Sequence, residues 1–233
     1  VLHHTYTNID SMDDDLDTHG VLRFSPNSKW NWFHKYQHIY AWFFYGIMTL
    51  VWLSSRDFDR LTKYKKMGFF SKKYEYQREL IKSFFLKVSF LTILLVMPII
   101  VNPVSWWIII TAFLSMHFLS GIIISLVFQT AHIMPKTDFP GLKKDETISL
   151  DRMEHQLAST SNYSPKSRLF SWFIGGLNFQ IEHHLFPEIC HVHYKALSKK
   201  VKPLVEKYGL PYNSKQNFIK AVYDHFRMLK SLG

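Results

Sequence analysis

The sequence predicts an all-α integral membrane protein, in which a transmembrane helical hairpin and interfacial helices carry a cytoplasmic helical cap. Two observations lead to this class. Residues 88–132 contain no Asp, Glu, Lys or Arg, and basic residues crowd the flanks of this stretch. The rest of the chain is charged and interrupted by prolines, which is why the mean hydropathy of the 233 residues is only −0.07.

The composition excludes several other classes. The net charge is +10, but the basic residues flank apolar segments instead of forming one face with stacking aromatics, so we expect no nucleic-acid partner. The single cysteine, Cys190, excludes an internal disulfide and a multi-cysteine metal site. The chain begins at Val1 without Met or a basic leader, and we expect the N-terminal part of a longer protein to be missing.

The first apolar run, residues 39–53, is too short to cross a bilayer, which takes about 20 residues. Its aromatic rings suit the headgroup region, where Trp and Tyr are enriched. We therefore predict an interfacial helix here, followed by a strongly basic segment over residues 54–87.

The uncharged stretch predicts the hairpin. At a rise of 1.5 Å per residue, about 45 residues can hold two helices that each cross roughly 30 Å of hydrocarbon. Pro103 cannot continue a helix, so we place the spans at about 84–101 and 104–129. The tip carries no basic residue whereas both flanks do, which puts both chain ends in the cytoplasm. A buried hairpin in a soluble protein is the alternative, but soluble helices rarely lack charge for so long.

Residues 133–233 resemble a soluble domain, with many charges and prolines. Within them, residues 193–210 have apolar positions at helical spacing and a basic outer face, which predicts an amphipathic surface helix. This region supplies most of the predicted cytoplasmic cap.

Two histidine pairs and one further histidine are the candidate ligands of a metal site in this cap. His3 and His4 lie at the N-terminus, His132 ends the second predicted span, and His183 and His184 follow Gln180 at helical spacing. The predicted topology puts all of them on one side of the membrane. Neutral imidazole is a common ligand of iron, copper and zinc, and five imidazoles exceed the need of one structural zinc. The pattern favours a redox metal pair without identifying the metal, and chance clustering is the alternative.

The stretches "VLHHTYTN" and "QIEHHLFP" resemble the middle and late histidine boxes of the membrane fatty acid desaturases. The glutamine at position 180 is typical of the front-end branch, which includes delta-6 and delta-5 acyl desaturases. The resemblance covers the whole chain from the middle box onward. The early box, the first histidine of the middle box and the first pair of spans have no counterpart, so the chain resembles an N-terminally truncated member.

This resemblance implies that His3, His4, His132, His183 and His184 bind two non-haem iron ions as a di-iron centre. It implies a cis double bond introduced into a fatty acyl chain, carried as acyl-CoA or acyl-lipid, with O₂ and electrons from a donor such as ferredoxin or cytochrome b5. No catalytic residue beyond the metal ligands is implied. The composition leans toward the inner membrane of a bacterium; a eukaryotic protein would lie in the endoplasmic reticulum.

Two alternatives stay open at this stage. A fatty acyl or lipid hydroxylase or ketolase of the same di-iron superfamily would carry the same histidines. A non-enzymatic haem-binding membrane electron carrier would need paired histidines that face each other across two spans, and only His117 lies inside a span.

Several other residues are weaker candidates. The residues that we consider as further metal ligands, or as hydrogen-bond partners of the ligands, are Gln180, Asn178, Gln129 and His155. His117 fits either the acyl tunnel or helix packing. Hydrogen-bond partners for the histidine ligands could come from Asp10, Asp14, Asp15, Glu154, Glu182 and Asn178. We expect ordinary surface or interfacial positions for His19, His34, His38 and His225.

Overall fold

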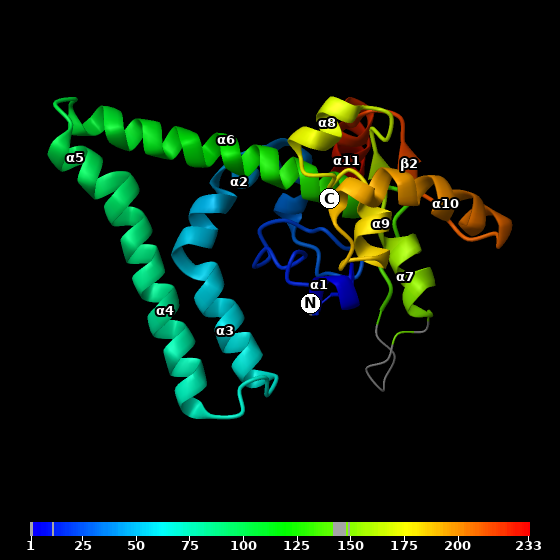
Figure 1. Cartoon of the computed structure of the whole chain (residues 1–233), viewed down its shortest axis with the longest axis horizontal. Helices are drawn as coiled ribbons and strands as arrows, with labels where there is room; N and C mark the ends of the chain where they lie inside the picture. The colour runs from blue at the N-terminus through cyan, green and yellow to red at the C-terminus, as the bar shows by residue number, and fades with distance from the viewer. Residues whose placement is uncertain (1, 11, 142–147, 149) are drawn as a thin grey trace. The chain divides into compact units, whose positions relative to one another are not determined.

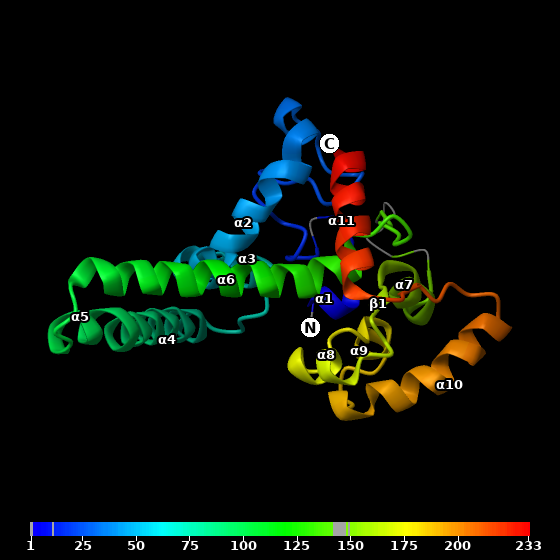
Figure 2. The ribbon, with the colours of Figure 1, turned by 90° about the horizontal axis from the view of Figure 1, so that it is seen from above.

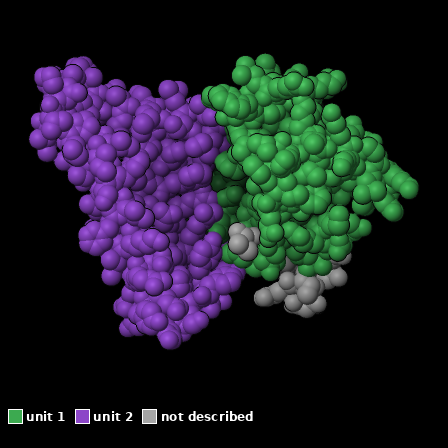
Figure 3. Space-filling view, viewed as in Figure 1, with its two compact units in different colours: residues 1–41, 126–233 green, residues 42–125 purple. Residues whose placement is uncertain are grey.

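The computed structural model describes residues 2–10, 12–141, 148 and 150–233, and most of these residues are helical. The chain divides into two compact units, one of residues 1–41 and 126–233 and one of residues 42–125 (Figure 3). We call them unit 1 and unit 2. Helices α2 and α6 each continue from one unit into the other.

Unit 2 consists of long helical segments (Figure 1). Helix α2 (Gln37–Val51), the π-helical turn η2 (Trp52–Arg56) and α3 (Asp57–Lys66) follow one another without a break. After a loop come α4 (Lys73–Leu91), the π-helical turn η3 (Thr92–Val96), α5 (Met97–Val101) and then α6 (Trp106–His132). The predicted helix over residues 39–53 is present but extends to Lys66, because the polar residues that follow the apolar run continue the helix.

Two of these segments are long and apolar enough to cross a membrane. They are Lys73–Val101 and Trp106–His132, with mean hydropathies of 2.5 and 2.1 in their most apolar windows. The helix ends at Val101, as expected for a segment that precedes Pro103.

Helices α2 and α6 pack closely within unit 2. A Cβ atom on Gly121 would overlap the backbone oxygen of Gly46, and one on Gly46 would overlap the ring of Phe118. Only glycine permits such an approach of two backbones. Beside this crossing, His117 Nδ1 lies 3.0 Å from Thr49 Oγ1, and the Thr49 hydroxyl donates to the His117 carbonyl at 2.9 Å. His117 therefore takes part in helix packing.

Unit 1 assembles short elements from both ends of the chain (Figure 2). The N-terminal part gives α1 (Leu2–Thr5) and the 3₁₀ turn η1 (Trp32–Tyr36). The C-terminal part gives α7 (Arg152–Ser159), β1 (Asn162–Tyr163), α8 (Arg168–Phe173), α9 (Gln180–Leu185), η4 (His191–His193), α10 (Tyr194–Lys207), β2 (Ser214–Lys215) and α11 (Phe218–Leu232). The only departure from an all-α fold among the described residues is the two-residue parallel pair β1–β2, in which Asn162 lies opposite Ser214.

Two apolar clusters hold unit 1 together. One joins the end of α6 to β1 and α11 through Ala131, Met134, Tyr163 and Ala221. The other packs α7, α9 and α10 through Leu157, Ile181 and Val205. Helix α10 confirms the predicted amphipathic helix: Tyr194 and Val205 are buried on its inner side, and its lysines face outward.

The expectation of surface positions was wrong for His34 and His225, which are fully buried. His34 Nε2 donates to the carbonyl of Gly20 and His225 Nδ1 to the carbonyl of Ile133, each at 2.9 Å. A buried imidazole is tolerated when its polar atoms are paired, and the residue type alone does not reveal such a partner. His19 is exposed, as expected.

Candidate metal centre

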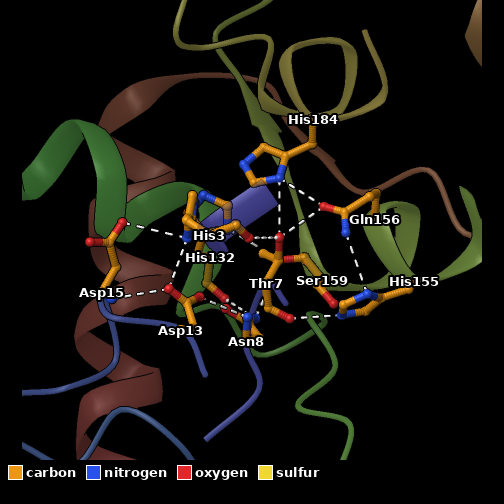
Figure 4. Close-up of polar contacts among 10 residues, drawn as sticks. All are labelled: His3, Thr7, Asn8, Asp13, Asp15, His132, His155, Gln156, Ser159 and His184. Atoms are coloured by element: carbon orange, nitrogen blue, oxygen red, sulfur yellow. Dashed lines mark hydrogen bonds and ion pairs between the residues drawn. The ribbon is translucent and has the colours of Figure 1, made fainter. Parts of the chain in front are cut away.

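Three elements of unit 1 bring the five predicted histidines together. Helix α1 carries His3 and His4, the last residue of α6 is His132, and α9 carries His183 and His184. The rings of His3, His132 and His184 form a triangle, with centroid distances of 4.9, 5.0 and 4.8 Å (Figure 4). One nitrogen from each lies within 4.8 Å of the others, which is close enough for a single ion to be shared.

The other two histidines extend this triangle into a continuous cluster. His4 stacks on His184 with a centroid distance of 4.4 Å, and His183 meets His4 edge-on at 4.6 Å. His184 is thus the central ring, in contact with all four of the others.

Three of the rings, those of His3, His183 and His184, make a hydrogen bond through Nδ1. His3 Nδ1 donates to the buried carboxylate of Asp13 at 2.9 Å, with Asp15 Oδ2 at 3.4 Å. His184 Nδ1 donates to Gln156 Oε1 at 2.8 Å, and His183 Nδ1 lies 3.0 Å from the Tyr194 hydroxyl. Metal-binding histidines in proteins are oriented in this way, with one nitrogen bonded to an acceptor and the other left for the ion.

Two nitrogens of the clustered rings lack hydrogen-bond partners among the described residues. Nε2 of His132 and Nε2 of His184 are buried and have no hydrogen-bond partner within the described part of the chain. A buried polar atom without a partner is costly, on the order of 1–3 kcal/mol. A metal ion removes this cost, so the residues present fit a bound cation.

The electrostatics favour the neutral, ligating form of most of these rings. Burial, with the neighbouring imidazoles, lowers the pKa of His4 to about 4 and that of His184 well below its usual value. Burial also lowers the pKa of His183. Burial also acts to lower the pKa of His3, but the hydrogen bond and the negative charge of Asp13 outweigh this effect, so the pKa of His3 is raised. The carboxylates beside His3 supply negative charge for a cation.

Comparison with known proteins identifies the family of the chain. A family model described as "Fatty acid desaturase" matches residues 1–216. The chain belongs to the fatty acid desaturase family. It is 29% identical to an sn-1 linoleoyl-lipid 6-desaturase of Arthrospira platensis over 100% of this chain and 62% of that protein. It is 30% identical to an acyl-lipid (8-3)-desaturase of Physcomitrium patens, over 99% of this chain and 48% of that protein.

A Delta(5) fatty acid desaturase A of Dictyostelium discoideum is 32% identical over 99% of this chain and 50% of its own length. The chain thus spans about half to two thirds of the length of these desaturases. No solved structure matches the chain significantly.

The weaker site candidates lie at different distances from the histidine cluster. Gln180 is buried and its Nε2 has no partner among the residues described. Asn178 donates from Nδ2 to the Ser164 carbonyl at 3.3 Å, and Gln129 lies buried near the end of α6. His155 reaches the cluster indirectly, through Gln156.

The hydrogen-bond partners of the histidines were mostly not predicted. Of the carboxylates proposed for this role, Asp15 lies near His3, but Asp13 makes the closer contact. Glu182 instead accepts hydrogen bonds from Asn162 and the Tyr212 hydroxyl, both at 2.8 Å. Gln156 and Tyr194 carried no signal in the sequence, because neither lies at a fixed spacing from the histidine that it contacts.

An open pocket of about 460 Å³ borders the cluster at His183. Apolar side chains form most of its wall, and its polar lining includes Cys190, His191 and Tyr194. Of the five clustered histidines, His183 is therefore the one that lines this pocket.

Proposed function

We propose that this protein is a fatty acyl desaturase, in which His3, His4, His132, His183 and His184 bind two iron ions. The observation that carries the proposal is the convergence of five imidazoles, in which Nδ1 of His3 and of His184 donates to a protein acceptor and the buried Nε2 atoms of His132 and His184 lack partners among the described residues. His3, His132 and His184 are grouped closely enough for one ion. His4 and His183 offer further nitrogens for a second.

The reaction that we propose removes two hydrogens from neighbouring methylene groups of an acyl chain and forms a cis double bond. O₂ takes up these two hydrogens, together with two electrons and two protons, and leaves as two molecules of water. Bound iron supplies the oxygen chemistry, and the protein supplies binding, orientation and exclusion of competing reactions. Asp13 holds His3, Gln156 holds His184 and Tyr194 holds His183 in place.

The substrate that we propose is an acyl chain esterified in a membrane lipid, since two of the relatives named above are acyl-lipid desaturases by name. We further propose that Lys73–Val101 and Trp106–His132 cross the bilayer and that both chain ends are cytoplasmic.

The electron donor that we propose is an acidic redox protein, such as ferredoxin or cytochrome b5. Helix α10 belongs to the same unit as the histidines and presents five lysines, Lys195, Lys199, Lys200, Lys202 and Lys207. A positive face steers an acidic partner and increases the association rate. Charge reversal on α10 should therefore slow reduction more at low salt than at high salt.

Expression of the full-length protein tests the proposal directly. Lipids of the expressing cells should gain a cis alkene, the purified protein should contain iron, and His184→Ala should abolish both. A hydroxylated lipid without a new alkene would replace desaturation by hydroxylation. A Soret band without iron at this site would instead favour a haem-binding electron carrier.

A further inference from the structure

We infer that His155 is a positioning residue, whose imidazole fixes the orientation of the Gln156 amide and so presents Nε2 of His184 to the metal. This inference rests on the proposed function, because it assumes that His184 binds an ion. Figure 4 shows the residues involved: His155 and Gln156 belong to α7, Thr7 follows α1, and Gln156 contacts His184 of α9.

The first step concerns the proton on His155. Its Nε2 lies 2.7 Å from the carbonyl oxygen of Thr7, and a carbonyl can only accept a hydrogen bond. Nε2 therefore carries hydrogen. Burial lowers the pKa of His155, which keeps the ring neutral, so its Nδ1 has a lone pair and must accept.

The second step concerns the Gln156 amide. One of its two terminal atoms lies 3.4 Å from His155 Nδ1, and the other lies 2.8 Å from His184 Nδ1. Because His155 Nδ1 accepts, the nearer amide atom is the NH₂ group. The amide oxygen consequently faces His184, and the opposite orientation would leave two donors or two acceptors in contact.

The third step concerns His184. Its Nδ1 faces the amide oxygen, so Nδ1 carries the hydrogen and Nε2 keeps its lone pair. Nε2 is the atom that is buried without a partner among the described residues. With the amide reversed, Nδ1 would accept instead, Nε2 would carry hydrogen, and His184 could not bind an ion through it.

Thr7 packs against the same amide. Its hydroxyl, which has one hydrogen to donate, lies 2.6 Å from the carbonyl oxygen of His3, 2.8 Å from Gln156 Oε1 and 3.2 Å from His184 Nδ1, and its own carbonyl accepts from His155. Since the side chains of Thr7, His155 and Gln156 are fully buried, water is not available to replace the missing bonds if one is removed.

The test is iron affinity, measured by equilibrating the purified full-length protein with a series of chelators. His155→Phe keeps the ring shape but removes both nitrogens, so the amide is free to reverse. We expect iron affinity to fall about 10- to 100-fold, the usual loss when a partner of a histidine ligand is removed. His34→Phe is the matched control, because His34 is an equally buried histidine without contact to Gln156, and it should leave iron affinity unchanged.

The decisive variant combines His155→Phe with Gln156→Glu. A carboxylate accepts through both oxygens, so its orientation no longer matters, and we expect a recovery of iron affinity of about tenfold or more. Gln156→Glu in the wild-type background measures the gain that the added charge gives by itself; if His155 only fills space, Gln156→Glu raises affinity no more in the His155→Phe background than in the wild type. His155→Leu replaces His155→Phe if the phenylalanine variant does not fold.

Two results overturn the inference: unchanged iron affinity in the apolar His155 variant, or a gain from Gln156→Glu in that variant no larger than the gain in the wild type. Failure of the proposed function looks different. In that case the wild-type protein binds no iron, whatever residue stands at position 155.

Discussion

Asp13 is the residue that offers the cleanest test of electrostatic support at the metal centre. Its carboxylate accepts from His3 Nδ1 and from the backbone NH groups of Asn8 and Asp15. In Asp13→Asn, one acceptor becomes a donor and a charge that stabilises the cation is lost. We expect iron affinity to fall about 10- to 100-fold. Iron retained against chelators measures the change, and Asp17→Asn, which alters an exposed carboxylate, is the control.

The loss of folding stability at acid pH can also be traced to a single residue, His225. Burial lowers the pKa of His225 to about 4, from about 6.5 in an unfolded chain. The unfolded chain therefore binds a proton at a higher pH than the folded protein. The contribution of neutral His225 to stability is complete above about pH 6.5 and is lost as the pH falls toward 4. The difference corresponds to roughly 3 kcal/mol at most.

Thermal unfolding of the protein in detergent at pH 7.5 and pH 5 checks this expectation. The wild type should lose more stability on acidification than His225→Gln, in which the position no longer titrates. His19→Gln is the control, since His19 is exposed and should leave the pH dependence as it is. Equal acid sensitivity of wild type and His225→Gln would contradict the assignment.

The clustering of the five histidines could be predicted from the sequence, but their hydrogen-bond partners could not, and the reason is physical. Histidine pairs and a histidine at the end of an apolar helix are local patterns, and the predicted topology puts them on one side of the membrane. Which acceptor meets each Nδ1 depends on the backbone path of α1, α7 and α10. For this reason Asp13 was missed among its acidic neighbours, and Gln156 and Tyr194 carried no signal at all.

At the scale of elements, apolar runs located the helices but not their ends. The helix predicted over residues 39–53 belongs to a helical path that runs from Gln37 to Lys66. The hydropathy pattern marks only the apolar part of this helical path, whereas the helical backbone hydrogen bonds continue through the polar residues that follow it. The π-helical turns η2 and η3 were likewise not predicted, because no residue type marks such a turn.

The crossing of α2 and α6 provides a prediction at this scale. Gly121→Ala would place a methyl group against the backbone of Gly46 and Tyr45, so the helices must separate locally. Overpacking of this kind costs about 1–3 kcal/mol. We expect a lower midpoint of thermal unfolding in detergent. Ser115→Ala, an exposed position on the same helix, should leave it unchanged. A Gly121→Ala protein as stable as the wild type would show that the two backbones do not meet here.

At the scale of the whole molecule, charge placement governs the proposed topology. The residues between α5 and α6 carry no charge, whereas lysines and arginines precede α4 and follow α6. Basic segments remain in the cytoplasm, so the turn near Ser105 should lie on the opposite side from Cys190. Cys190 is exposed and is the single cysteine of the chain, which makes it a native probe for a thiol reagent.

Labelling with a membrane-impermeant maleimide tests this topology in bacterial cells that express the protein. In intact cells with a permeable outer membrane, Ser105→Cys combined with Cys190→Ser should react, while wild-type Cys190 should react only after the inner membrane is opened. Cys190→Ser alone is the control for reagent specificity. If both thiols reacted from the same side, the two helices would not form a transmembrane hairpin.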